Sequence, residues 1–374
     1  MSEEAIDGVR IAEIPTASGH RFGHATLDAP ASLNSLTLAM VDRLAAQLEA
    51  WIADAGIAGI VLDAAGDKAF CAGGDVIALY RSIRSAAPGT VPVEAATFFE
   101  REYRLDYRLH TCPKPVLCWG HGIVMGGGIG LLAGASHRVA TPKTRLAMPE
   151  ITIGLYPDVG GSWFLGRAPG RTGLFLALTG APMNAADARF AGLADFVIAH
   201  EDKAAVLQAI AAASWRGSRA ADDAALGALL DAHGCPIPES PLRAHYDRID
   251  ALVGHDGLAP AMQRIGALAG DPDRWLAQAG EAARRGSPSS AALAWTLQDQ
   301  ARHLSLADVF RLEYQASVGC CVHHDFAEGV RALLVDKDRN PRWQPATLAE
   351  VDDAWIAAHL QARHEGPHPL ADLA

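Results

Sequence analysis

Three consecutive glycines, Gly126 to Gly128, constrain the fold of this chain more than any other feature of its sequence. They lie in the stretch from His121 to Asp158 and run directly into small and apolar residues, from Ile129 to Ala135. Glycine has no Cβ, so another group can approach its backbone closely. A helix that starts here has first amides without a partner inside the helix, at the positive end of its dipole. The pattern therefore predicts a turn that binds a phosphate or an oxygen that becomes negative during a reaction.

Two carboxylates, Glu150 and Asp158, follow the glycine triplet, each directly after a proline and in otherwise apolar sequence. An isolated acid in such a place usually caps a helix or pairs with a cation, here Arg145 or Arg167. An ionised carboxylate among apolar residues is otherwise costly unless it has a role. Donors for an oxyanion together with two acids favour a site for acyl chemistry.

A second glycine cluster lies upstream. Residues Gly56 to Asp63 are typical of a short buried strand, and Ala69 to Asp75 follow with the sequence AFCAGGD. The pair Gly73-Gly74 exposes backbone N–H groups just before a helix that we expect to start at Val76. An oxyanion hole needs two amides that converge on one oxygen, and two glycine-rich turns supply them.

Together these stretches resemble the crotonase (enoyl-CoA hydratase/isomerase) superfamily. The resemblance rests on GDKAFCAGGD at residues 66–75 and HGIVMGGGIG at residues 121–130. Within that superfamily the sequence is most similar to the 3-hydroxyisobutyryl-CoA hydrolases. The similar segments are AMPEITIGLYPDVGG at 147–161, LALTG at 176–180, SPSSAALA at 287–294 and HDFAEGVRALLVDKDRNPRW at 324–343. A triplet of glycines alone would mean little, but these motifs occur in order over most of the chain.

The resemblance implies an α/β fold, the crotonase (ClpP-like) spiral of ββα units. The residues agree with it, because strand and helix signals alternate through the first half. Val9 to Ile14 and Arg21 to Leu27 are expected to form a hairpin, and Leu38 to Trp51 a helix. Beyond about His200, alanine-rich helical stretches dominate. We predict a spiral core over residues 1–205 and a mainly helical C-terminal region over residues 206–374.

The resemblance also implies roles for individual residues. The backbone amides of Gly74 and Gly127 would form the oxyanion hole, with Glu150 and Asp158 as the catalytic acids. Substrate binding would involve Gly127, Glu150 and Asp158 again, together with Ala72, Gly73, Asp75 and Glu102. The last of these lies in FFEREY, at residues 98–103, which resembles a segment lining the substrate pocket of the hydrolases. The family usually has a basic residue near Ala31, and its absence here removes one expected contact to the CoA phosphates.

Hydratases of the superfamily hold a water between two glutamates. Here the first position falls on Gly130, which has no side chain, and the second on Glu150. Hydration is therefore disfavoured. The expected reaction is hydrolysis of a short-chain 3-hydroxyacyl-CoA, specifically 3-hydroxyisobutyryl-CoA to 3-hydroxyisobutyrate and CoA in valine catabolism. Glu150 would either attack the carbonyl or activate a water. An enoyl-CoA hydratase or isomerase with altered acids, and a non-catalytic CoA-binding homologue, remain alternatives.

Composition limits the partners. A formal net charge of −11 argues against a nucleic-acid partner but not against a local site for anionic CoA. No apolar run reaches the ~18 residues of a membrane span. The sequence MSEEAIDG lacks signal-peptide and transit-peptide character, and six cysteines show no CxxC spacing, so we expect a cytoplasmic protein. A homo-oligomer is compatible with the family.

No resident cofactor or metal is expected, since coenzyme A is part of the substrate. The run His323-His324-Asp325 suggests metal ligands at first sight. Adjacent histidines point in different directions, however, and no third ligand is suitably spaced. We interpret His324 and Asp325 as structural residues.

Overall fold

The computed structural model describes residues 5–374, so the first four residues of the acidic N-terminal sequence lie outside the described range. The chain groups into two compact units, each built from separate segments. The first unit comprises Met1–Gly74, Leu105–Leu146 and Met183–Ser240, and the second comprises Asp75–Arg104, Ala147–Pro182 and Pro241–Ala374. The division at residue 205 rests on secondary structure and remains a prediction.

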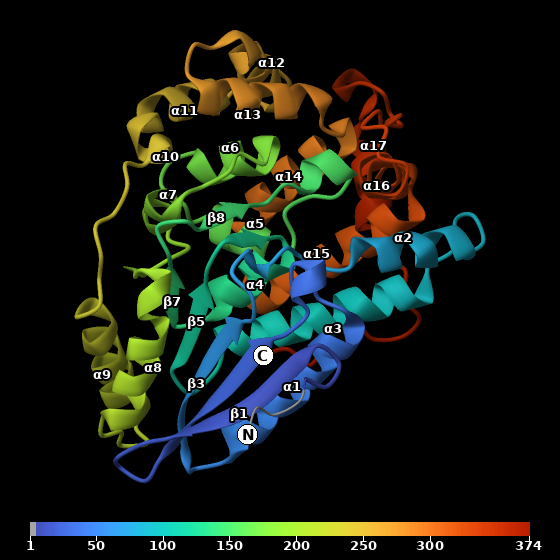
Figure 1. The fold of residues 1–374 in the computed structure, drawn as a ribbon. Coiled ribbons are helices and arrows are strands. Elements are labelled where there is room, and N and C mark those ends of the chain that lie inside the picture. Colours follow the sequence, from blue (N-terminus) through green and yellow to red (C-terminus); the bar gives the residue numbers. More distant parts are fainter. Residues whose placement is uncertain (1–4) are drawn as a thin grey trace. The chain divides into compact units, whose positions relative to one another are not determined.

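The first unit contains a six-stranded sheet with the order β1-β2-β3-β5-β7-β9 (Figure 1). Its strands are β1 (Val9–Pro15), β2 (Arg21–Leu27), β3 (Ile57–Ala64), β5 (Val116–Gly120), β7 (His137–Ala140) and β9 (Phe196–Val197). The predicted hairpin is confirmed, because β1 and β2 pair antiparallel with Val9 opposite Leu27. The other neighbouring pairs are parallel.

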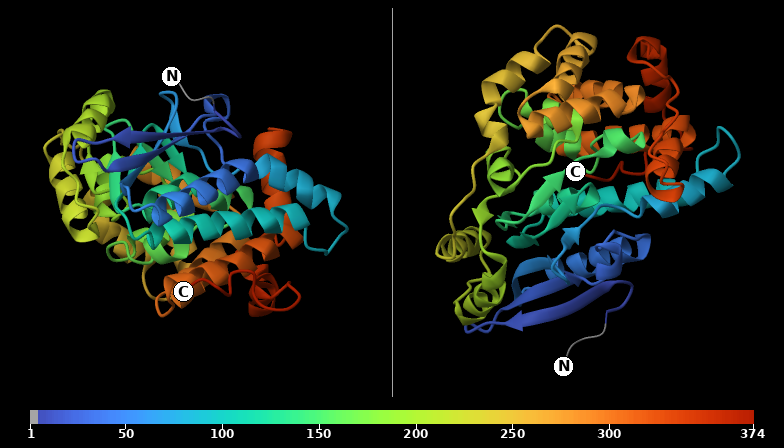
Figure 2. Two further views of the ribbon diagram at one scale, coloured as in Figure 1. Left: turned by 90° about the horizontal axis from the view of Figure 1, so that it is seen from below. Right: turned by 45° about the horizontal axis from the view of Figure 1, so that its top comes forward.

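Strand β3 shows why the central strands form. All of its residues are buried, as a parallel strand covered on both faces requires. Helices α8 (Lys203–Ala212) and α9 (Arg219–Asp231) pack beside each other in this unit (Figure 2). Their side chains join those of the sheet in one buried cluster that includes Val61, Trp119 and Leu226. Helix α1 (Leu38–Ala53) contacts β1, β2 and β3 and matches the predicted helix.

A second, three-stranded sheet has the order β4-β6-β8. It consists of β4 (Ala69–Cys71), β6 (Ile123–Met125) and β8 (Arg145–Ala147), and helix α4 (Gly127–Gly134) starts two residues after β6 ends. A helix that starts at the glycine triplet is therefore confirmed. These short strands were not predicted, because three residues carry too little alternation to be recognised. Helix α7 (Ala185–Phe190) ends just before Gly192, which adopts φ +75.

The second unit is mainly helical. It contains α2 (Val76–Ser85), the first part of α3 (Val93–His110), the 3₁₀ turn η2 (Glu150–Ile153), α5 (Gly161–Leu165), α6 (Thr172–Thr179), α10 (Pro241–Ala244), α11 (Tyr246–Val253), α12 (Leu258–Ala267), α13 (Arg274–Arg285), α14 (Pro288–Ala301), α15 (Leu306–Val322), α16 (His324–Val330), the π-helical turn η5 (Arg331–Val335) and α17 (Asp353–Leu360). The predicted helical C-terminal region is confirmed, as the described residues after Lys203 form no further strand.

Local sequence explains where these helices start and stop. Helix α2 begins at Val76 as predicted, because the Asp75 side chain accepts a hydrogen bond from the Ala78 amide, at 3.1 Å. Pro288 occupies the first turn of α14 behind the cap Ser287, so α13 and α14 are separate helices. None of the helices formed by residues 5–374 combines the length and apolar character that a membrane crossing needs.

Candidate active site

The two glycine turns of the first unit lie side by side. A Cβ added to Gly73 would be 3.4 Å from the backbone oxygen of Met125 and 3.9 Å from the nitrogen of Gly127. Gly73 has φ +106, and Gly126 has φ +48, so both turns use backbone conformations that favour glycine. At Gly128, a Cβ would lie 2.4 Å from the backbone oxygen of Cys71 in β4. The glycines are thus needed for the close packing of the two turns.

This packing brings two free amides together. Gly127 is the first residue of α4, and neither its N–H nor that of Gly74 donates a hydrogen bond within residues 5–374. Adjacent unpaired amides at a helix start are the donors that an oxyanion hole needs. The Ala72 amide differs, because it donates to the Leu33 oxygen at 3.1 Å. Asp75 uses its side chain to cap α2.

The second unit gathers the three acids that the sequence singled out. Glu102 lies on α3, Glu150 opens η2, and Asp158 lies in the loop before α5. Their exposed fractions are only 2%, 5% and 4%. The Oε1 of Glu102 and the Oε2 of Glu150 accept no hydrogen bond from residues 5–374. Buried carboxyl oxygens of this kind favour a water or a polar substrate group as their partner.

Burial and mutual repulsion make these acids hard to ionise. Burial and the nearby charge of Asp158 raise the pKa of Glu102 well above its usual value. The pKa of Glu150 is raised well above its usual value by burial, by the charge of Asp158 and by that of Glu102. Burial raises the pKa of Asp158 to about 6, although a hydrogen bond from Tyr103 opposes this rise. Like charges in one site disfavour full ionisation, so the three acids ionise less readily than isolated carboxyl groups.

Asp158 heads a chain of buried hydroxyl groups. The Tyr103 hydroxyl lies 2.7 Å from Asp158 Oδ2 and 2.7 Å from Ser317 Oγ. Ser317 Oγ is in turn 2.8 Å from the Tyr156 hydroxyl, which donates to the backbone oxygen of Glu313 at 2.6 Å. Four contacts therefore link Asp158 to the backbone of α15.

Counting protons shows which state of Asp158 suits this chain. With Asp158 ionised, the three hydroxyl groups supply three protons, so one of the four contacts lacks a hydrogen. A protonated Asp158 supplies the fourth: it donates to Tyr103, Tyr103 to Ser317, and Ser317 to Tyr156. Every contact is then a hydrogen bond. In the ionised form Tyr103 donates to Asp158 instead, and this hydrogen bond lowers the pKa, so the rise to about 6 comes from burial and Asp158 can gain or lose a proton near neutral pH.

The side chain of Glu313 supports the same loop. Its two carboxyl oxygens accept hydrogen bonds from the amides of Gly160 (2.7 Å) and Ser162 (2.9 Å), just beyond Asp158. The turn needs this support, because Val159 adopts φ +53, which is unfavourable for a β-branched residue. Burial raises the pKa of Glu313 to about 8.

Sequence reasoning missed these supporting residues. The sequence analysis predicts no role for Tyr103, Glu313 or Ser317. A signal was present in α15, where Glu313 and Ser317 are four residues apart and share one face of an otherwise apolar helix. Tyr103 directly follows Glu102 in the segment already marked for the substrate pocket.

The histidine run near the C-terminus makes structural contacts. His324 Nε2 lies 2.9 Å from the Arg342 oxygen, and Asp325 accepts hydrogen bonds from Ser287 Oγ (2.6 Å) and the Gln344 amide (2.8 Å). Within the described part of the chain, no group of three or more His, Cys, Asp or Glu side chains is arranged to hold a metal ion.

Comparisons with known proteins give the family. A family model described as "Enoyl-CoA hydratase/isomerase" matches residues 22–360. A curated 3-hydroxyisobutyryl-CoA hydrolase from Gallus gallus is 38% identical over 89% of this chain and 85% of its own length. The hydrolase of the same name from Homo sapiens is 36% identical over 91% of this chain and 86% of its own length.

Solved structures agree on the fold. A structure titled as a carnitinyl-CoA dehydratase from Mycobacterium thermoresistibile has a TM-score of 0.83 and 36% identity, covering 96% of this chain and 97% of its own. One titled as an enoyl-CoA hydratase from Rhodobacter sphaeroides has a TM-score of 0.81 and 35% identity, covering 94% and 97%. The names of these proteins give different reactions, but each name includes a CoA compound. The predicted crotonase fold is confirmed, and the chain belongs to the enoyl-CoA hydratase/isomerase family as an acyl-CoA enzyme.

Proposed function

We propose that this enzyme hydrolyses a short-chain 3-hydroxyacyl-CoA thioester, and that its substrate is 3-hydroxyisobutyryl-CoA in valine catabolism. The observation that carries the proposal is Asp158, which has a pKa of about 6 and heads a chain of buried hydroxyl groups, beside the buried Glu150. Hydrolysis needs a group that acts on the carbonyl and a group that gives a proton to the leaving sulfur. The identity to hydrolases from chicken and human supports the same reaction.

In the proposed reaction, the thioester oxygen accepts hydrogen bonds from the amides of Gly74 and Gly127. Each such donor is worth about 2.7–4 kcal/mol in comparable oxyanion holes. The C–S bond breaks, and the CoA thiolate takes the proton held by Asp158. Glu102, with its unpaired Oε1, accepts a hydrogen bond from the 3-hydroxyl group of the substrate.

Two routes use Glu150. As a nucleophile it attacks the carbonyl carbon, and water then cleaves the resulting anhydride; as a general base it activates the water directly. A single turnover in oxygen-18 water, quenched rapidly and followed by mass spectrometry of the Glu150 peptide, separates them. On the anhydride route an acyl-Glu150 species forms first. When water attacks the Glu150 carbon of this anhydride, the label enters the carboxyl group of Glu150.

Release of free thiol tests the proposal. Ellman's reagent would follow 3-hydroxyisobutyryl-, 3-hydroxypropionyl-, acetyl- and crotonyl-CoA, with Glu150→Gln as the control variant. We expect release from the 3-hydroxyacyl substrates and its loss in the variant. Consumption of crotonyl-CoA by hydration, without thiol release from any substrate, would contradict the proposal. Tight CoA binding without turnover would instead favour the non-catalytic homologue.

One observation favours a hydratase as the second candidate. Glu102 and Glu150 are both buried, each has an unpaired oxygen, and their charges influence each other. A glutamate from α3 would then replace the side chain that is missing at Gly130. Loss of the crotonyl-CoA absorbance, abolished by Glu102→Gln, is the result that would establish this alternative.

The nucleotide end of CoA is proposed to lie in the first unit. A cavity of about 410 Å³ adjoins Ala31, Asn34 and Lys68, with Lys68 as its cation. This is where the family's basic residue is missing from the sequence, so Lys68→Ala should raise KM for acyl-CoA more than it lowers kcat. A cytoplasmic location and a homo-oligomeric state likewise remain proposals, which cell fractionation and light scattering would test.

A further inference from the structure

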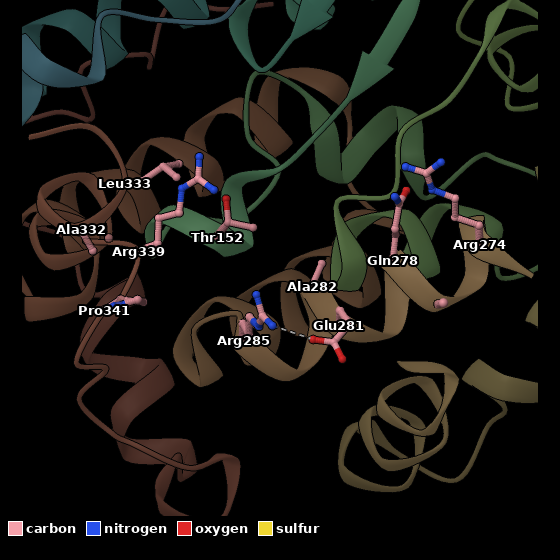
Figure 3. A pocket seen from close by; sticks show the side chains of 12 residues that line it. Thr152, Arg274, Gln278, Glu281, Ala282, Arg285, Ala332, Leu333, Arg339 and Pro341 are labelled. Atoms are coloured by element: carbon pink, nitrogen blue, oxygen red, sulfur yellow. Dashed lines mark ion pairs between the residues drawn. The ribbon is translucent and has the colours of Figure 1, made fainter. Parts of the chain in front are cut away.

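A cavity of about 500 Å³ opens on the second unit, apart from the acid cluster (Figure 3). One wall is a single face of α13, because the lining residues recur every three or four positions from Arg274 to Arg285. This face is roughly 16 Å long at 1.5 Å per residue. Thr152, Leu333 and Arg339 contribute to the opposite side. The cavity is therefore elongated along the helix.

Two of its three arginines have no acidic partner. Arg285 is neutralised by Glu281, with 3.0 Å between Nη2 and Oε2. Neither Arg274 nor Arg339 forms an ion pair with a carboxylate in residues 5–374. The acids closest in sequence to Arg339, Asp336 and Asp338, both bind Arg331 instead. Unpaired guanidinium groups are notable in a chain with a net charge of −11.

The two unpaired arginines lie at opposite ends of the row of side chains, Arg339 beside Leu333 and Arg274 beside Gln278 (Figure 3). The lining also includes the apolar residues Ala277, Ala282 and Leu333. Leu333 is 38% exposed, one of few large apolar side chains so exposed in the described chain. A ligand that covers this lining would bury apolar surface as well as meet two cations.

The walls are held in place by backbone hydrogen bonds. The Ser287 amide donates to the Ile151 oxygen at 3.0 Å, which fixes the end of α13 to η2 beside Thr152. The Trp343 indole N–H donates to the Arg285 oxygen at 2.8 Å and ties down the segment that follows Arg339. The cavity is thus formed before a ligand arrives, which reduces the entropy lost on binding.

We propose that this cavity binds an elongated aliphatic dicarboxylate, with one carboxylate at Arg339 and the other at Arg274. A guanidinium group binds a carboxylate through two parallel hydrogen bonds, so each end of the ligand is recognised separately. Inorganic phosphate satisfies one end only and leaves the apolar lining exposed. The site uses neither Glu150 nor Asp158, so binding is independent of the proposed hydrolysis.

Isothermal titration calorimetry on the full chain tests the proposal. The probes are sebacate, decanoate as a monocarboxylate of the same length, inorganic phosphate and free CoA. We expect one sebacate per chain, bound more tightly than decanoate, and no measurable phosphate binding. Equal affinities for sebacate and decanoate would overturn the assignment of two anion sites. Competition between CoA and sebacate would overturn a separate site.

Variants locate the binding. Arg274→Gln and Arg339→Gln should each weaken sebacate binding about tenfold or more, since each removes a charged hydrogen-bond partner. In either variant the affinity for sebacate should fall close to that for decanoate. Arg284→Gln is the matched control, because Arg284 is exposed on the same helix and does not line the cavity. Sebacate affinity that survives both Arg274→Gln and Arg339→Gln, or that falls equally in Arg284→Gln, would refute the proposal.

Discussion

Replacing Tyr103 with phenylalanine tests the proton-bearing role of Asp158 most directly. The substitution keeps the buried ring and removes only the hydroxyl group that lies 2.7 Å from Asp158 Oδ2. That hydroxyl donates to the ionised carboxylate and holds the pKa of Asp158 below the value that burial alone would give. Without it the carboxylate loses a donor, and the protonated form is favoured.

The size of the effect follows from the hydrogen bond. A hydrogen bond to a charged group is worth about 1.5–3 kcal/mol, and one pKa unit corresponds to about 1.36 kcal/mol. Tyr103→Phe should therefore raise the pKa of Asp158 by about one to two units. The starting value is about 6. If protonated Asp158 gives its proton to the leaving sulfur, activity is lost on the alkaline side, as Asp158 ionises, and this limb moves upward.

The assay is the pH dependence of kcat/KM for thioester cleavage, which reports the ionisations of the free enzyme. Tyr156→Phe is the matched control, because its hydroxyl contacts Ser317 and the backbone of Glu313 but not Asp158. We expect the alkaline limb to shift in Tyr103→Phe and to stay close to wild type in Tyr156→Phe. Superimposed profiles, or a shift toward lower pH, would refute the argument that Tyr103 donates to the ionised Asp158.

Three further predictions concern stability. Asp158→Asn should stabilise the fold by up to about 3 kcal/mol at pH 8, because burial raises the pKa from 3.8 to about 6 at about 1.36 kcal/mol per unit. The folded state holds the Asp158 proton more tightly than the unfolded chain does, so the stability of the wild type falls as pH rises from about 3.8 through 6. At pH 3.5, where both states are protonated, urea unfolding should therefore show no gain in stability for Asp158→Asn. Gly128→Ala should lower the free energy of unfolding in urea by about 1–3 kcal/mol, because the added Cβ meets the backbone of β4. Gly227→Ala on α9 is the control: no neighbour is closer than 3.8 Å, so the free energy of unfolding should rise by about 0.5–1 kcal/mol. Equal effects of the two substitutions would contradict the packing argument. Glu313→Gln should cost about 1–3 kcal/mol of stability and so lower Tm, because the new NH2 group faces one of the two backbone N–H donors, Gly160 or Ser162. An unchanged Tm would show that the turn does not depend on Glu313.

The parts of the fold that the sequence predicted are those set by neighbouring residues. The start of α2 at Val76 was predictable because its cap, Asp75, lies within one helical turn of sequence. The glycine turns were predictable for the same reason, because the backbone conformations at Gly73 and Gly126 are local properties. Strand β4 escaped prediction, since its three residues form a strand only through pairing with β6.

The support of the acid cluster was not predictable in this way. Tyr103 and Ser317 meet although 214 residues separate them in the sequence. Glu313 contacts the Gly160 amide across 153 residues. A hydroxyl or carboxyl group with such a distant partner looks in the sequence like any other polar residue on a helix. Only the folded arrangement shows that they serve Asp158.

These distant contacts change the meaning of the C-terminal helices. Helix α15 supplies Ser317 to the hydroxyl chain and Glu313 to the turn beyond Asp158, so it belongs to the acid cluster of the second unit. Burying several carboxyl groups costs stability, because each must lose its hydration before it can hold or give up a proton. The hydrogen bonds from α15 offset part of that cost and fix the position of Asp158. Helix α15 is therefore part of the structure that holds Asp158 in place inside the protein, and not an appendage to the spiral core.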